Sequence, residues 1–406
     1  MKSRWQQIFR QVYLRILTRQ VPHAILSWRY FIPNQSMMVN RHKRVLFNAW
    51  TKLPRSVWWL IALYSYSVWY LFNSWRQIAR VWKNRSLELY HHNGISRVKQ
   101  LMHLTVLAIG HTIPPHFYYL YRLYDYKENQ WLDFIYTHEL PHWHQMMSPN
   151  ISMRSQHLMS DKVDFAHAMT AVGLPLITTL YARSKGEKIT EQQLFNQKSM
   201  FLKPIHGSQK KGALALIYRA QSDCYDLTGD GAEHLGNVDS NNHRSGIVNF
   251  IQQKINQEAY LFQPLLKNDT ELSTIFSCKE LITVRLITAL NNENTLQAIS
   301  AVLEIPNDGR YNQVHNLAIE ITAGRLIKPS DDFDTELLAK YRLGSELKIP
   351  NWQHVVDISI NAHKSFLDIY AIGWDLTITA AGIKLIEGNI NWGLVAHQVN
   401  TPLIIK

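Results

Sequence analysis

Residues 373–389 read GWDLTITAAGIKLIEGN, two apolar segments joined at an Ala-Ala-Gly sequence. Alternating apolar residues on both sides of a turn predict a β-hairpin. Glu387 and Asn389 are two residues apart and share a strand face, so Asp375 on the partner strand can converge on them. Two carboxylates and an amide carbonyl are hard oxygen donors, which suit Mg²⁺ bound to nucleotide phosphates. The alternative interpretation is a solvated hairpin tip.

A second informative stretch lies at residues 201–212, which read FLKPIHGSQKKG. It predicts a short strand followed by a loop of Gly, Ser and Lys. Lys203 would present a point charge to phosphates, and the loop from Gly207 to Gly212 would offer backbone N–H groups at close range. The stretch lacks the Gly-x-x-x-x-Gly-Lys-Ser/Thr pattern of a Walker A motif. Taken alone, it could equally be a basic surface loop.

Two apolar segments lie between these stretches. Residues 259–266 (AYLFQPLL) could form a hinge that clamps a base, and residues 281–288 (LITVRLIT) predict a β-branched strand that carries Arg285. An arginine inside a strand is costly to bury without an anionic partner, and a phosphate would satisfy it. The alternative is an arginine on an edge strand that faces water.

The order of these segments, with Asp161-Lys162 upstream, resembles the ATP-grasp superfamily and specifically its sugar-transfer associated branch, which is related to α-L-glutamate ligase-like proteins. The resemblance covers roughly residues 130–400. It implies an α+β fold in which two α+β subdomains clamp ATP, preceded here by a basic, Trp-rich helical region. We expect this helical region at 1–125, a pre-ATP-grasp αβ segment at 126–185 and the ATP-grasp domain at 186–406, divided into a nucleotide-loop subdomain (186–262) and a catalytic subdomain (263–406).

The resemblance also implies roles for the matching residues. Lys162 and Lys203 resemble the lysines that hold the ATP phosphates, and Arg285 resembles the strand arginine that neutralises the phosphoryl group in transfer. Arg285 and Lys203 would be the catalytic residues. The other implied positions are Gly207, Ser208 and Gly212 in the loop over the phosphates, Gln263 and Leu265 at the adenine hinge, and Asp375, Glu387 and Asn389 as ligands of one or two Mg²⁺ ions.

The implied chemistry is ligation of a carboxylate to an amine. Phosphoryl transfer from ATP would give an acyl phosphate, which an amine would convert to an amide. The expected substrates are sugar- or lipid-linked, and the product would belong to a cell-surface polysaccharide or its precursor. The alternatives are an ATP-dependent phosphotransferase acting on a sugar or related acceptor, and a non-catalytic, nucleotide-binding, membrane-associated scaffold. Two segments depart from the family pattern: the lysine-rich loop at 209–211, and residues 390–393, which lack the usual proline.

Charge is distributed very unevenly along the chain. Residues 1–100 contain 17 Lys and Arg against one acidic residue, Glu88, whereas the remaining 306 residues contain 26 against 30. The same first hundred residues hold eight of the 13 tryptophans. Basic residues interleaved with Trp and Tyr predict contact with an anionic membrane surface or a polyanion. No nucleic-acid partner is expected, because no nucleic-acid-binding motif accompanies the charge.

Residues 57–72 form an uncharged run of 16 residues. A span of the bilayer core needs about 20, so an interfacial helix is favoured over a buried core helix and over a membrane span. The only two cysteines, Cys224 and Cys278, argue against a disulfide framework and suit a reducing compartment. No secretory signal is visible. We therefore expect a cytoplasmic protein, peripheral to the inner face of the cytoplasmic membrane.

Residues 138–142 read HELPH, a literal match to the His-Glu-x-x-His motif of zinc proteases. That motif needs an unbroken helix, so that its two histidines share a face. Pro141 lies inside the motif and would break such a helix. The favoured interpretation is therefore a group of polar histidines near a helix end.

Overall fold

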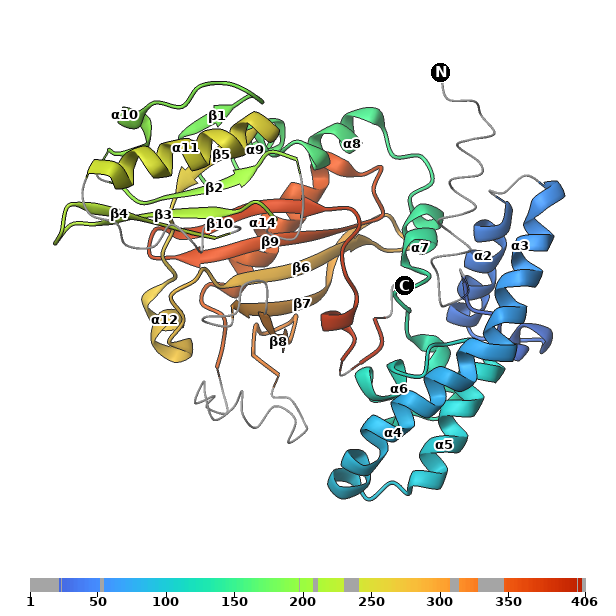
Figure 1. The fold of residues 1–406 in the computed structure, drawn as a ribbon. Coiled ribbons are helices and arrows are strands. Elements are labelled where there is room, and N and C mark those ends of the chain that lie inside the picture. Colours follow the sequence, from blue (N-terminus) through green and yellow to red (C-terminus); the bar gives the residue numbers. More distant parts are fainter. Residues whose placement is uncertain are drawn as a thin grey trace. The chain divides into compact units, whose positions relative to one another are not determined.

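The computed structural model of the chain describes residues 22, 24–51, 55–196, 198–206, 211–229, 241–306, 314–327, 347–399 and 401–403. The described residues form two compact units (Figure 1). The first unit comes from the stretches Met1–Pro149 and Asn391–Lys406, and the second from Asn150–Lys328 and Glu336–Ile390. The subdomain boundaries expected from the sequence, at 125, 185 and 262, stay predictions.

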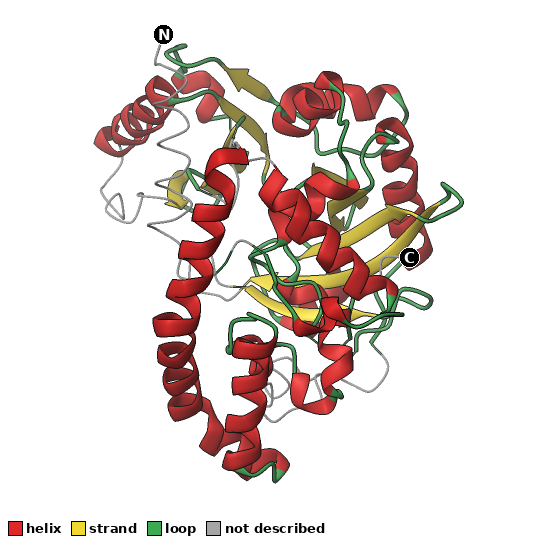
Figure 2. Cartoon of the chain, turned by 90° about the vertical axis from the view of Figure 1, so that its right-hand side faces the viewer, coloured by secondary structure: helices red, strands yellow, loops and turns green. Residues whose placement is uncertain are grey.

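The first unit is helical, as the sequence predicts. Elements α3, η2 and α4 follow one another without a break and form one continuous helix with a π turn at η2 (Figure 2). No helix in the described ranges is long and apolar enough to cross a bilayer. The elements are η1 (Trp28–Phe31), α2 (Met37–Thr51), α3 (Arg55–Val68), η2 (Trp69–Asn73), α4 (Ser74–Asn93), α5 (Arg97–Thr105), η3 (Val106–Gly110), α6 (Phe117–Leu120), η4 (Leu123–Asp125), η5 (Glu128–Asp133), α7 (Leu140–Met147) and η8 (Val395–His397).

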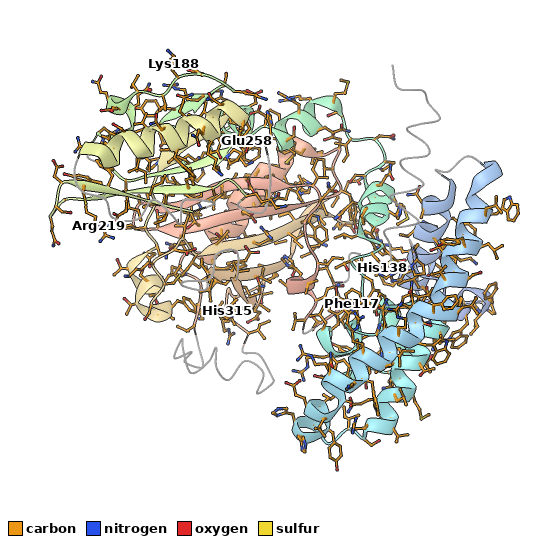
Figure 3. The ribbon with its side chains drawn as sticks, viewed as in Figure 1. Phe117, His138, Lys188, Arg219, Glu258 and His315 are labelled. Atoms are coloured by element: carbon orange, nitrogen blue, oxygen red, sulfur yellow. The ribbon has the colours of Figure 1, made fainter. Side chains whose placement is uncertain are left out.

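Aromatic side chains fill the interior of this unit. Phe117 packs with Tyr121 and Tyr136 at ring-centroid distances of 5.0 and 5.1 Å, and His138 lies 6.5 Å away (Figure 3). Such large rings bury much apolar area each, so a few of them supply most of a small core. Among the tryptophans of the first hundred residues whose side chains the structure describes, Trp69 is buried in this interior and Trp59 is half exposed.

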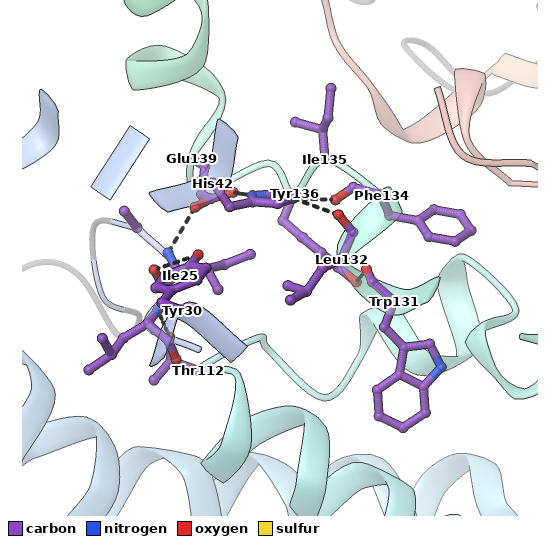
Figure 4. Close-up of polar contacts among 12 residues, drawn as sticks. Ile25, Tyr30, His42, Thr112, Trp131, Leu132, Phe134, Ile135, Tyr136 and Glu139 are labelled. Carbon is purple, nitrogen blue, oxygen red and sulfur yellow. Dashed lines mark hydrogen bonds and ion pairs between the residues drawn. The ribbon is translucent and has the colours of Figure 1, made fainter. Parts of the chain in front are cut away.

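A buried ion pair ties several segments of the helical unit together (Figure 4). Glu139 Oε2 lies 2.6 Å from His42 Nδ1, and Glu139 Oε1 accepts a hydrogen bond from the backbone N–H of Ile25 at 2.8 Å. His42 Nε2 lies 3.1 Å from the carbonyl oxygens of Leu132 and Phe134, to which it can only donate. Burial alone would raise the pKa of Glu139, but the charge and hydrogen bond of His42 outweigh burial and lower it. Glu139 is therefore ionised, and both ring nitrogens of His42 face oxygen acceptors.

The His-Glu-x-x-His match does not form a zinc-protease helix. Helix α7 begins at Leu140 with Pro141 in its first turn, where proline is tolerated, and Glu139 is its N-cap. His138 therefore precedes the helix that carries His142, and the two histidines do not share a helix face. Glu139 has the structural role described above.

The second unit contains two antiparallel five-stranded sheets. The first has the strand order β1-β5-β2-β3-β4. Helix α11 covers it with Ile247, Ile251 and Ile255, which are spaced four residues apart and pack against buried strand residues such as Leu202. The elements of the chain from the start of the second unit to the end of this sheet are α8 (Met153–Ser160), α9 (Lys162–Ala171), β1 (Tyr181–Arg183), α10 (Glu191–Leu194), β2 (Met200–Pro204), β3 (Leu214–Arg219), β4 (Cys224–Gly229), α11 (Asn241–Gln257) and β5 (Tyr260–Pro264).

The second sheet has the strand order β10-β9-β6-β7-β8. Helix α14 packs on it through residues such as Val355 and Ala362, in a core that also includes Phe165 and Met169 of α9. Every residue of β9 is buried, so this strand is covered on both faces. Its elements are α12 (Thr270–Phe276), β6 (Thr283–Leu290), β7 (Leu296–Pro306), β8 (Val314–Ile319), α14 (Trp352–His363), η7 (Lys364–Phe366), β9 (Ala371–Thr379) and β10 (Gly382–Asn389).

The hairpin predicted from residues 373–389 is confirmed as β9 and β10, which turn so that Gly382 lies opposite Thr379. The sequence of residues 173–177, GLPLI, predicts a short strand, and this prediction is wrong. Among the described residues this segment contributes one parallel bridge, between Leu176 and Leu385, and the backbone N–H of Leu385 donates to Pro175 O at 2.8 Å. Pro175 has no N–H to donate to a ladder, which is one reason the segment does not extend as a strand.

Candidate functional site

Three predicted site residues lie side by side on the second sheet. Arg285 of β6 is directly opposite Asp375 of β9, which is directly opposite Glu387 of β10. Directly opposite side chains lie on the same face of a sheet. The three side chains therefore form a row across adjacent strands.

A β-bulge in β10 creates this alignment. Leu385 is opposite Leu376 and Glu387 is opposite Asp375, so Ile386 is an extra residue without a direct partner. Without the bulge, Ile386 would face Asp375, and Glu387 would be turned to the other face of the sheet. The sequence offers no clear signal for a bulge at this position.

Two carboxylates hold the Arg285 guanidinium. Its Nε and Nη2 donate to the two carboxylate oxygens of Asp375 at 2.7 and 2.8 Å, and its Nη1 lies 2.9 Å from Glu304 Oε1. Burial lowers the pKa of Arg285, but Asp375, Glu304 and Glu387 outweigh burial and raise it. Since β6 is the central strand, Arg285 is not the edge-strand arginine considered as an alternative. Sequence reasoning missed Glu304, because it lies on β7 within an ordinary apolar strand sequence.

Asn389 completes a cluster of oxygen-bearing side chains. Its Nδ2 lies 3.3 Å from Asp375 Oδ2 and 3.5 Å from Glu387 Oε1. Among the described residues, no three His, Cys, Asp or Glu side chains are grouped closely enough to hold a metal ion. The amide of Asn389 would therefore supply the third ligand, after turning to present its oxygen instead of its nitrogen. Two carboxylates and one amide oxygen, with positions left for water and phosphate, fit Mg²⁺.

Both predicted phosphate-binding lysines lie within the electrostatic field of Glu387. Lys203 is on β2, and burial lowers the pKa of its amine. The charges of Glu387 and Asp375 oppose this shift, and the charge of Lys162 adds to it. Lys162 is the first residue of α9, and its Nζ donates to Ile205 O at 3.0 Å.

Burial also lowers the pKa of Lys162, against the opposing charges of Glu387, Asp161 and Glu258, the last of which is labelled in Figure 3. The two lysines and the carboxylates thus form one charged cluster, although they come from both sheets and from α9.

The remaining predicted residues belong to the loop and to the end of β5. Gly207 and Ser208 lie outside the described residues. Gly212 has φ +74°, which favours glycine, and its carbonyl accepts a hydrogen bond from Tyr260 Oη at 3.0 Å. Gln263 is buried on β5, and the backbone N–H of Leu265 donates to Ser199 O at 3.1 Å. Both residues lie where the chain leaves the first sheet for α12 and the second sheet.

A buried chain of hydrogen bonds includes Trp374, the residue that precedes Asp375 in the sequence. Trp374 Nε1 donates to Thr288 Oγ1 at 2.7 Å, and Thr288 Oγ1 lies 2.6 Å from His363 Nδ1. His363 Nε2 lies 2.8 Å from Ile369 O, so Nε2 carries the ring proton and Nδ1 accepts from Thr288. The chain joins β9, β6 and α14, and Trp374 points to the opposite face of β9 from Asp375. His363 and Trp374 lie 75 and 86 positions after Thr288 in the sequence, so the sequence gives no local signal of their contact with it.

Comparisons with solved structures give likenesses of low sequence identity and low TM-score. An N5-carboxyaminoimidazole ribonucleotide synthetase with ADP is 14% identical over 58% of this chain and 46% of its own, with a TM-score of 0.35. A D-alanine–D-alanine ligase from Bacillus anthracis with ATP is 10% identical over 60% of this chain and 59% of its own, with a TM-score of 0.34. The ATP-grasp ligase PsnB, with a precursor variant, Mg and ADP, is 13% identical over 70% of this chain and 66% of its own, with a TM-score of 0.34.

The chain thus spans less than two thirds of the length of each of these structures. No curated protein matches the sequence. A family model, described as sugar-transfer associated ATP-grasp, matches residues 141–405, which include all the predicted site residues. The chain belongs to the sugar-transfer associated ATP-grasp family.

Proposed function

We propose that the protein is an ATP- and Mg²⁺-dependent ligase that joins a carboxylate to an amine through an acyl phosphate. The observation that carries this proposal is the cluster of Asp375, Glu387 and Asn389 beside Arg285, in which the two carboxylates also interact electrostatically with Lys203. Oxygen ligands next to cationic side chains match what a metal–nucleotide complex requires. Membership of the ATP-grasp family supports the same conclusion.

The protein's own groups would act mainly by position and charge. Lys162 and Lys203 would hold the nucleotide phosphates, and Arg285 would neutralise charge on the phosphoryl group in transfer. Because Asp375 and Glu304 already orient the guanidinium, no reorganisation is needed during the reaction, and its remaining N–H donors can serve a phosphoryl oxygen. Asp375, Glu387 and Asn389 would hold Mg²⁺, whose charge would offset that of the nucleotide phosphates.

The reaction has two steps. A substrate carboxylate oxygen bonds to the γ-phosphorus of ATP, the bond from that phosphorus to the β-phosphate oxygen breaks, and ADP leaves. An amine nitrogen then bonds to the acyl carbon, phosphate leaves, and the nitrogen loses a proton to give the amide. Little general base catalysis is needed if the amine arrives unprotonated, so we assign no base.

The family description and the composition of the first hundred residues support a substrate class and a location. The family description links these proteins to sugar transfer, which favours a cell-surface polysaccharide or its precursor as the modified molecule. Use of ATP favours the cytoplasm. The basic, Trp-rich first hundred residues favour a peripheral position at the inner face of the cytoplasmic membrane, within reach of a lipid-linked substrate.

The proposal is tested by measuring ADP release and Mg²⁺-dependent nucleotide binding with pooled amino acids and sugar acids. Glu387→Gln removes one carboxylate ligand, and Lys203→Ala removes one phosphate contact. Each change should lower substrate-stimulated ADP release by about 100-fold or more, as is typical when a charge-stabilising group is lost. The matched controls are Glu293→Gln and Lys279→Ala, which alter exposed residues of the same unit and should leave the rate unchanged.

The other outcomes separate the alternatives. A stable phosphorylated product that forms without an amine would indicate a phosphotransferase. Nucleotide binding without turnover on any substrate would favour the scaffold. If the wild type does not bind nucleotide, the site assignment is wrong.

A further inference from the structure

The continuous helix α3–η2–α4 carries a long row of apolar side chains that are exposed to solvent. They recur three or four residues apart within each helical stretch, and seven or eight apart across the π turn, so they line one side of the helix. Leu63 is 61% exposed and Leu71 is 67% exposed, whereas Leu104 and Leu107 of the same unit are fully buried. The row, called here the apolar face, consists of Trp59, Leu60, Leu63, Tyr64, Leu71, Phe72 and Trp75.

The opposite side of the same helix is anchored in the helical unit. Tyr66 Oη donates to Ala24 O at 2.9 Å, and Trp69 Nε1 donates to Ala108 O at 2.8 Å. Ile78 is also buried. Rotating the helix to bury the apolar face would expose Trp69 and break both hydrogen bonds. The apolar face is therefore a fixed outer surface of the helix.

Basic side chains continue the row along α4. Arg76, Arg80 and Lys83 follow Phe72 at intervals of four, four and three residues, and all three are exposed. Glu88, the only acidic residue among the first hundred, is paired with Arg85 at 3.2 Å. One side of a single helix thus presents Trp, Tyr and Leu followed by a cationic segment. This combination matches the boundary between lipid headgroups and acyl chains in an anionic membrane.

Other occupants of this surface fit less well. Residues 1–21 carry five basic and no acidic residues, so this segment would bring positive charge to the cationic part of α4. A second copy of the chain that docked through the same surface would bring the same charge. A nucleic acid would satisfy the basic residues but would leave the apolar face in water.

We propose that this side of α3–η2–α4 docks on an anionic lipid membrane, with the helix lying in the plane of the headgroups. The absence of a span-length apolar helix among the described residues agrees with a surface position for this helix. The proposal rests on the membrane-proximal location given under the proposed function, and it assigns that location to named residues.

The test is co-sedimentation of the full chain, without nucleotide, with vesicles of phosphatidylcholine mixed with phosphatidylglycerol or of phosphatidylcholine alone. One variant carries Leu63→Gln, Leu71→Gln and Trp75→Gln, and a second carries Arg76→Gln, Arg80→Gln and Lys83→Gln. The matched controls change exposed residues of the second unit. The apolar control carries Val172→Gln and Leu367→Gln, and the basic control carries Lys267→Gln, Lys279→Gln and Lys364→Gln.

The wild type should prefer the anionic vesicles. The basic variant should bind them roughly 100-fold more weakly, since each surface charge contributes about fivefold. The apolar variant should lose at least as much, because it removes the groups that enter the acyl boundary. Both controls should bind like the wild type, and added salt should weaken binding.

Three results would overturn the proposal. The first is no binding of the wild type to anionic vesicles, and the second is binding by both variants within twofold of the wild type. The third is a dimer in solution that the apolar variant converts to a monomer, which would make a second copy the occupant. Far-UV circular dichroism checks folding, and the basic variant keeps the test decisive if the apolar one unfolds. Because no nucleotide is present, failure here leaves the ligase proposal standing, and failure of that proposal leaves this one standing.

Discussion

At the scale of single residues, Gly388 links the packing of the second sheet to its candidate site. It lies between Glu387 and Asn389, and a Cβ at this position would lie 2.6 Å from Trp374 Cζ3 and 3.0 Å from Met159 Sδ. Trp374 is itself held by its hydrogen bond to Thr288, so its ring has little freedom to move. The glycine is therefore required by close packing, and it keeps both neighbouring side chains at their positions beside Asp375.

Gly388→Ala should lower the free energy of unfolding by about 2 kcal/mol, because overpacking a fixed aromatic ring has this order of cost. It should also weaken Mg²⁺-dependent nucleotide binding, since the flanking residues must shift. Chemical denaturation and calorimetric titration measure the two effects. Gly246→Ala is the matched control: nothing lies near its added Cβ, and alanine favours helix α11 by up to about 1 kcal/mol. Unchanged stability in Gly388→Ala would mean that Trp374 can move freely.

At the scale of secondary-structure elements, the His42–Glu139 pair holds α2, the start of α7 and the segments at Ile25 and Leu132 together. Both side chains are fully buried, so removing one partner leaves the other as an unpaired charge. Glu139→Leu should therefore lower the free energy of unfolding by about 3–5 kcal/mol. Chemical denaturation followed by circular dichroism measures the loss.

The double variant His42→Leu with Glu139→Leu tests whether the two side chains interact as a pair. It should be less destabilised than the sum of the two single variants, because no buried charge is left unpaired. Strict additivity would contradict the assignment of these residues as a buried ion pair.

The sequence predicts elements well where the pattern is local and poorly where it depends on contacts. The β9–β10 hairpin follows from alternating residues and a turn, and the start of α7 follows from Pro141. The β-bulge at Ile386 and the contact between Glu304 and Arg285 depend on how separate strands pair, which a single sequence does not encode locally. The segment at 173–177 has strand-like residues but makes a single bridge to the rest of the described chain, because tertiary context overrides propensity.

At the scale of the whole molecule, both compact units contain buried histidines that resist protonation. Burial lowers the pKa of His363 to about 4, against the opposing effects of Ile369 O and Asp368. Burial likewise lowers the pKa of His144 to about 4, and burial with the charges of Arg29 and His42 lowers that of His111 to about 4. All three shifts have the same sign, so their effects on stability reinforce one another.

These histidines should make the protein sensitive to mild acid. Each has an unfolded pKa near 6.5 and a folded pKa of about 4, so between these values the unfolded state binds more protons and stability falls as pH falls. As the pH falls, each histidine should lower the free energy of unfolding by roughly 3 kcal/mol, and this loss is complete near pH 4. His363→Gln removes this titration from the second unit, so its stability should change less between pH 7 and pH 5 than that of the wild type, even if its stability at pH 7 is lower. Urea denaturation across this range measures the slope, and equal slopes for the two proteins would show that His363 is protonated in the folded state without penalty.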